Sequence, residues 1–201
     1  VGARGLGPIQ RLLLGSVSSS VVHSVRIPVL VARPRADGLA NQPWRVLLAY
    51  DATEPSRHAA DLLGRLTWPA NTVGRVVNVM ESMLAGNVPH WLEEKARTAD
   101  EEAMAKAWVR EHDAEKQQHR QELAALEARL PAAFQNREPL VAEGYPAEQI
   151  LKTIAAESID LVVMGARGLG IVGRVLMGST STKVLTHAPC SVMIVREKER
   201  P

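Results

Sequence analysis

The sequence contains a single cysteine, Cys190, among 201 residues. One thiol cannot form a disulfide within the chain, which excludes the disulfide scaffolds of small secreted proteins and favours a reducing, cytoplasmic location. Because Cys190 lies between a predicted helix end and an apolar strand, we interpret it as a small buried hydrophobic residue, with a reactive thiol as the alternative.

Long apolar runs and a strong charge of one sign are also missing. No stretch approaches the roughly 20 apolar residues that span a bilayer, and the opening VGARGLGPIQRLLLG lacks the sustained apolar core of a signal peptide. The formal net charge of +2 gives no strongly basic face for nucleic acid. We therefore expect neither a membrane nor a nucleic acid as partner. Valine in place of an initial methionine indicates a fragment or a cleaved product.

Glycine is concentrated in one stretch, DLVVMGARGLGIVGRVLMGSTST, at residues 160–182. Its apolar run, 161–164, predicts a buried parallel strand. The glycines that follow allow close approach of the backbone to a ligand, and the terminal GSTST predicts a helix start capped by hydroxyl groups. A strand that leads through glycines into a helix N-terminus offers backbone N–H groups to an anion, most commonly phosphate.

The spacing of these glycines differs from the two commonest phosphate loops. A Gly-x-Gly-x-x-Gly match occurs at 168–173, but no helix opens directly after it and no Gly-Lys-Ser/Thr follows. Instead, Gly165-x-x-Gly168 is followed after nine residues by Gly178-Ser179. With the flanking DLVVMG and HAPC segments, this pattern resembles the nucleotide-binding motif of the universal stress protein family, and the likeness covers residues 44–196. It implies an α/β fold with an open, mostly parallel five-stranded sheet and helices on both faces, Rossmann-like and similar to the adenine nucleotide alpha hydrolases.

The resemblance also implies a binding site for ATP or ADP, with Mg²⁺ held chiefly through the phosphates. The residues at the matching positions are Ala49, Tyr50, Asp51, Val79, Met164, Gly165, Arg167, Gly168, Gly178, Ser179 and Thr180. Asp51 ends a predicted strand, where ligands of parallel sheets bind, and its carboxylate can accept from ribose hydroxyls. Alternatives stay open: Asp51 can cap the following turn, Val79 can be an ordinary core residue, Arg167 can be solvent-exposed, and the glycines can form only a tight crossover.

An internal repeat relates the two ends of the chain. Residues 1–33 align with 164–196 at an offset of 163, with GARGLG identical in both copies. We expect 1–34 to be the end of a first stress-protein domain, 35–43 to be a linker and 44–197 to be a complete domain, as in the C-terminal part of a tandem protein. Family members pair through their final strands, so Val29–Ala32 is predicted to lie antiparallel to Val192–Val195 as a pseudo-dimer, with a homodimer through the same strands or a partly disordered tail as alternatives.

The remaining elements follow from periodicity. Strands are expected at 44–50, 72–79, 137–142 and 191–196, and helices at 16–25, at 147–158 and from 53 to about 66, with Thr53 as cap. Residues 99–130 keep helical spacing, but 110–122 are almost entirely polar. This segment is either one helix that projects into solvent or a helix that breaks, and it presents a solvated face or an arm for a partner.

These features favour an ATP-binding stress sensor or signalling module over an enzyme. No general base beside the glycines and no arginine finger can be placed, so turnover is expected to be weak at most. A slow ATPase or autokinase that modifies Ser179–Thr182 is one alternative. A nucleotide-free dimerisation scaffold is the other.

Overall fold

The computed structural model describes residues 1–3, 15–35, 42–81, 99–166 and 177–196, with the backbone alone for 99–102, 104 and 105. The strands are β1 (Val29–Val31), β2 (Arg45–Ala49), β3 (Val73–Met80), β4 (Leu140–Glu143), β5 (Leu161–Gly165) and β6 (Ser191–Val195). The helices are α1 (Ser16–Ser24), α2 (Glu54–Arg65), α4 (Ala99–Glu127), α5 (Pro146–Ala156) and α6 (Ser179–His187), with a short 3₁₀ helix η2 (Ala132–Phe134).

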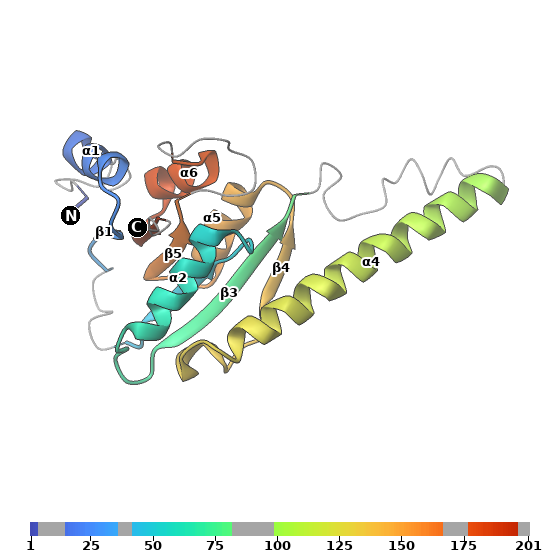
Figure 1. Ribbon diagram of the computed structural model, residues 1–201, viewed down its shortest axis with the longest axis horizontal. Coiled ribbons are helices and arrows are strands. Elements are labelled where there is room, and N and C mark those ends of the chain that lie inside the picture. The colour runs from blue at the N-terminus through green and yellow to red at the C-terminus, as the bar shows by residue number, and fades with distance from the viewer. Residues whose placement is uncertain (4–14, 36–41, 82–98, 167–176, 197–201) are drawn as a thin grey trace.

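The strands form one sheet in the order β1-β6-β5-β2-β3-β4 (Figure 1). The last five of these strands are parallel, and β1 runs antiparallel to β6. The predicted open α/β sheet is therefore confirmed: the complete domain supplies five parallel strands, and β1 of the N-terminal segment extends the same sheet to six. β4 begins later than the predicted 137, since Pro139 has no N–H for the ladder and Arg137 pairs with Glu157 at 3.0 Å.

Alternating residues of the central strands build a core on each face of the sheet. In β2, Val46 and Leu48 pack with residues of α2, α4 and η2, whereas Leu47 and Ala49 pack with residues of α1, α5 and α6. All four side chains are at most 7% exposed. The predicted helices on both faces are therefore present, with the α2 and α4 layer on one side and the α1, α5 and α6 layer on the other.

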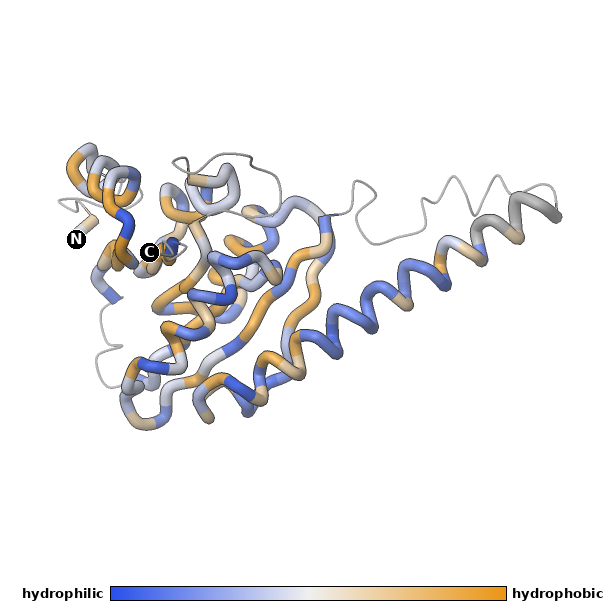
Figure 2. The backbone as a smooth tube through the Cα atoms, in the orientation of Figure 1, coloured by the Kyte–Doolittle hydropathy of each residue, from blue (hydrophilic) through white to orange (hydrophobic). Residues whose placement is uncertain are grey.

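Helix α4 is continuous over 29 residues, about 43 Å at 1.5 Å per residue. It contains no proline or glycine, so the polar stretch does not break it, and the alternative of a broken helix was wrong. Among its described side chains, Leu123 and Leu126 near the C-terminal end join the core, and Leu123 is 1% exposed. The N-terminal part extends away from the sheet (Figure 1), and the middle is hydrophilic along its length (Figure 2).

Strand β1 pairs with β6 in the predicted antiparallel arrangement. The paired residues are Val29 with Ile194, Leu30 with Met193 and Val31 with Val192. The repeat offset of 163 carries Val29 onto Val192, Leu30 onto Met193 and Val31 onto Ile194. Exchanging the copies therefore maps the two outer pairs onto each other and the central pair onto itself, so a local two-fold axis passes between Leu30 and Met193.

Two arginines at equivalent repeat positions make reciprocal contacts across this axis. Arg33 donates through Nη2 to the carbonyl of Leu185 in α6 at 2.8 Å, and Arg196 donates through Nη2 to the carbonyl of Val22 in α1 at 2.8 Å. The offset of 163 relates Arg33 to Arg196 and Val22 to Leu185. Each copy thus satisfies carbonyls near the C-terminal end of the other copy's helix.

The residues around Arg33 bind the N-terminal segment to the rest of the chain. Arg33 is 7% exposed, and burial lowers the pKa of its guanidinium. It also donates to the carbonyl of Cys190 at 3.3 Å. Cys190 is itself 7% exposed, and burial raises the pKa of its thiol to about 11, so the predicted buried, unreactive cysteine is what the structure contains.

The described part of the predicted linker is also held in place. Arg35 contacts Asp160 at 2.8 and 3.0 Å and lies over the ring of Trp44, 4.8 Å from its centroid. Asp160 additionally accepts from the backbone N–H of Arg45 at 2.9 Å. The carboxylate therefore connects the end of the N-terminal segment to the starts of β2 and β5.

Candidate functional site

Three of the predicted site residues meet at the carboxyl edge of the sheet. Ala49 ends β2 and pairs in register with Met164 of β5, and Val79 lies near the end of the neighbouring β3. All three belong to the core on the α5 and α6 side, where Ala49 is 7% and Met164 is 4% exposed and Val79 is half-buried. Ends of adjacent parallel strands are where such sheets bind ligands.

The carboxylate of Asp51 organises the turn that enters α2. Its Oδ1 accepts from the backbone N–H of Thr53 at 3.1 Å and from the Thr53 hydroxyl at 2.5 Å. Between them, Ala52 adopts a φ of 58°, in the left-handed region that is uncommon for alanine. The turn alternative for Asp51 is therefore realised. The side chain stays half-exposed at the edge of the sheet.

Thr53 occupies the N-cap position of α2, as predicted, but its side chain makes no capping hydrogen bond. Its hydroxyl donates to Asp51 instead. Pro55 lies in the first turn, as predicted.

Gly165 provides room for helix α2. A Cβ built on Gly165 would lie 2.9 Å from the Cβ of Pro55 and 2.9 Å from the backbone nitrogen of Ser56. Real Cβ atoms do not approach so closely, so the first turn of α2 packs directly against the end of β5. At this position the glycine is required by packing within the protein.

The N-terminus of α6 lies next to the end of β5. The backbone N–H of Gly178 donates to the carbonyl of Ala166 at 2.8 Å, and the Ser181 hydroxyl donates to the same carbonyl at 2.7 Å. Gly178 is the N-cap residue of this helix and makes no side-chain cap hydrogen bond. The predicted helix start is therefore present, but the expectation of a hydroxyl cap was wrong at the N-cap position, because glycine has no hydroxyl group.

Two predicted residues, Arg167 and Gly168, lie outside the described residues. Tyr50 is described, but its side chain does not join the others: it packs with the core on the α2 and α4 side. Only its backbone lies at the strand end, where its carbonyl accepts from Nδ2 of Asn78 at 2.9 Å. A strand alternates its faces, so Tyr50 and the preceding Ala49 point to opposite sides.

A charged cluster at the end of β4 was missed by sequence reasoning. Glu143 contacts Lys116 at 2.7 Å and His112 at 3.2 Å, both from the polar part of α4. The hydrogen bond from Lys116 holds the pKa of Glu143 below its usual range against the opposing effect of burial, and His112 adds to the lowering. Trp108 stacks on His112 with ring centroids 5.1 Å apart. The polar stretch of α4 is thus partly bound to the sheet.

No metal site of protein ligands is present in the described part of the chain, where no three His, Cys, Asp or Glu side chains gather to hold an ion. Among the described helices, none is both long and apolar enough to cross a membrane.

The sequence and the fold are similar to those of known proteins. The sequence model of the Universal stress protein family matches residues 1–33 and 44–196. A universal stress protein of Thermus aquaticus is 34% identical over 151 residues, which are 75% of this chain and 97% of that protein. One from Mycolicibacterium smegmatis is 28% identical over 210 residues, and there the chain spans 98% of itself but 61% of the relative.

Among solved structures, a universal stress protein from Archaeoglobus fulgidus superposes with a TM-score of 0.55 at 24% identity, over 98% of this chain and 60% of that one. This likeness concerns the fold. Together with the matched residues of the family model, which cover most of the sequence, it leads to one conclusion. The chain belongs to the universal stress protein family.

Proposed function

We propose that the chain binds an adenine nucleotide, ATP or ADP, at the carboxyl edge of β2, β3 and β5, and acts as a nucleotide-dependent sensor or signalling module. The observation that carries the proposal is the meeting of Ala49, Val79 and Met164 on one face of the sheet. Val79 is half-buried and can contact the base above the buried Ala49 and Met164, and Asp51 stands at the same edge to accept from ribose hydroxyls.

The phosphates would lie at the start of α6. This helix begins at Ser179 behind an N-cap glycine without a side-chain cap, so its first amides suit an anion. Arg167 and Gly168 would complete the loop from the region between Gly165 and Gly178. Mg²⁺ would be held chiefly through the phosphates.

We further propose that 1–34 is the end of a first domain of the same kind, joined by a linker, 35–43, to the complete domain at 44–197. The support is the reciprocal strand register and the reciprocal arginine contacts. In this interpretation β1 and β6 form the centre of a pseudo-dimer within one chain.

Nucleotide extraction tests the proposal directly. Protein purified without added nucleotide is denatured, and the supernatant is analysed for ATP and ADP. Isothermal titration with ATP then gives the affinity. Bound adenine nucleotide or saturable binding is expected, and the absence of both would leave a scaffold as the better description.

Matched substitutions locate the binding. Asp51→Asn keeps an acceptor for the Thr53 turn but removes the charge, so ATP affinity should fall about 3- to 10-fold with little change in stability. Val79→Ala should also weaken binding, since apolar contact with the base is lost. Val141→Ala is the control, because Val141 is equally half-buried but packs on the opposite side of the sheet. Equal affinities for all three variants would contradict the site.

Timed release of ADP from the same samples separates binding from turnover. The sensor interpretation predicts a rate close to the background without protein. Turnover well above that background, or stable incorporation of labelled phosphate into the protein, would favour a slow ATPase or autokinase.

A further inference from the structure

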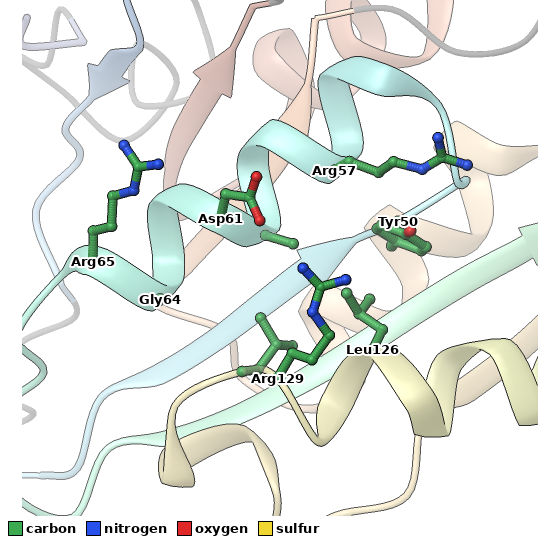
Figure 3. Close-up of a pocket in the computed structure, with 9 residues that line it drawn as sticks. Tyr50, Arg57, Asp61, Gly64, Arg65, Leu126 and Arg129 are labelled. Carbon is green, nitrogen blue, oxygen red and sulfur yellow. The ribbon is translucent and has the colours of Figure 1, made fainter.

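A recess lies between α2 and α4, on the side of the sheet opposite the proposed nucleotide site (Figure 3). It has a volume of about 490 Å³, within the range of small-molecule sites. Its lining comprises Tyr50, Arg57, Ala60, Asp61, Gly64, Arg65, Leu126, Arg129 and Leu130 (Figure 3). Tyr50 belongs to the core on this side, whereas Ala49 and Met164 belong to the other. The recess is therefore separated by the sheet from the proposed nucleotide site.

Small residues on α2 create the space. Ala60 and Gly64 are four residues apart, so they lie on the same face of the helix. A Cβ built on Gly64 would meet no atom within 4 Å, which shows that this face of α2 is open at Gly64. The apolar lining opposite comes from the end of α4, where Leu126 is half-buried and Leu130 is 5% exposed.

The charged lining is predominantly cationic, with three arginines against one aspartate. Arg57, Asp61 and Arg65 follow at four-residue spacing along α2, and Arg129 extends from the end of α4 into the gap between the two helices (Figure 3). Within the described residues, none of the three guanidinium groups has a hydrogen bond or ion pair to another side chain. Their donors are thus available to a ligand.

We propose that this recess binds a small amphipathic monoanion, with a flat apolar body and one carboxylate or sulfonate group. The apolar part would contact Tyr50, Leu126 and Leu130, and the anion would receive charge-assisted hydrogen bonds from Arg129 and Arg57. With Asp61, the three arginines give the charged lining a net charge of +2, which attracts an anion, and the apolar residues beside them favour a ligand that also has an apolar body. The proposal is independent of nucleotide binding on the other face.

Isothermal titration of the full chain with 2-naphthoate tests the proposal, with saturating ATP present so that the nucleotide edge does not contribute. Inorganic sulfate and the neutral 2-naphthalenemethanol are the comparison probes. We expect 2-naphthoate to bind at least about tenfold more tightly than either, because it alone combines the charge with the apolar body. Equal affinity for the neutral compound, or no binding of 2-naphthoate, would overturn the proposal.

Two variants place the probe in the recess. Arg129→Gln should weaken 2-naphthoate binding about tenfold by removing a charged donor, and Gly64→Leu should abolish it by filling the space. Arg120→Gln is the control, since it makes the same charge change at an exposed position of α4 outside the lining. Because Arg129 is exposed, its variant is expected to fold. Unchanged affinity of Arg129→Gln, or amide shifts on 2-naphthoate addition that centre on Gly178 instead of Gly64, would contradict the site.

Discussion

At the scale of single residues, the ionisation of Glu127 depends on folding. It lies near the end of α4, and its Oε1 is buried without a hydrogen-bond partner in the described structure. Burial raises the pKa of Glu127 from 4.5 to about 7, partly offset by Arg75 and reinforced by Glu138. A carboxyl group whose pKa is raised by folding binds more protons in the folded state between these two values.

This predicts a specific pH dependence of stability. The contribution of Glu127 is fully present below pH 4.5 and is lost as pH rises through about 7. Glu127→Gln removes this loss, so its unfolding free energy relative to the native sequence should increase from pH 5 to pH 8 by a few tenths to about 1 kcal/mol after allowance for solvent screening. Urea unfolding at both pH values measures the difference. Glu115→Gln, an exposed change of the same charge on α4, should show no such increase; parallel behaviour of the two variants would refute the assignment.

Substitution by alanine is expected to have opposite effects on stability at Gly74 and at Gly64. A Cβ on Gly74 would lie 2.4 Å from the ring of Phe134, so Gly74→Ala should destabilise the protein by about 1–3 kcal/mol through overpacking. Gly64 lies within a helix and faces open space, so Gly64→Ala should stabilise by about 0.5–1 kcal/mol. Thermal unfolding would show the two shifts in opposite directions. Shifts of the same sign would contradict the packing around η2.

At the scale of elements, the two reciprocal arginines should contribute unequally. Both cap carbonyls of the other copy's helix, but Arg33 is 7% exposed whereas Arg196 is half-exposed. Arg33→Met leaves the buried carbonyls of Leu185 and Cys190 without their donors and should cost about 1–3 kcal/mol. Arg196→Met should cost less, because water can replace the lost donor. Chemical denaturation of both variants checks the order, and a larger loss for Arg196→Met would show that burial does not set the energies.

The elements show how far sequence reasoning reaches. Short apolar runs identified β2 and β5, because such runs are visible locally in the sequence. The pairing of β1 with β6 was predicted from the internal repeat together with the pairing of final strands that the family resemblance implies. The attachment of α4 through Glu143 was missed, since a charge pair between residues 27 apart leaves no local pattern. The missing side-chain cap of α2 has a local cause instead: the Thr53 hydroxyl donates to Asp51, two residues earlier.

The candidate site was predictable only in part. Strand ends place Ala49, Val79 and Met164 at one edge, which follows from the parallel order of the strands. The opposite orientation of the Tyr50 side chain also follows from strand alternation but requires the position of Ala49 to be known first. The close packing of Gly165 against Pro55 was not visible in sequence, because it depends on the angle at which α2 leaves the sheet.

At the scale of the whole molecule, β1 covers an edge of β6 that would otherwise be open. Val192 and Ile194 are at most 1% exposed with β1 in place, and an uncovered apolar strand is a template for pairing. A chain that begins at residue 42 should therefore dimerise through β6, whereas the full chain should not use this edge. Light scattering after size-exclusion chromatography distinguishes the two. A shortened chain that stays monomeric at high concentration would show that β1 is not needed as a cover.

The two-fold relation between β1 and β6 also has a consequence for how mutations affect this interface. In an assembly of two identical polypeptides, a mutation at the axis alters both partners at once, so its energetic effect is doubled. Here Leu30 and Met193 are two positions of one chain, so each can be substituted independently of the other. The unlike pair at the centre, Leu30 opposite Met193, is consistent with such independent substitution of the two positions.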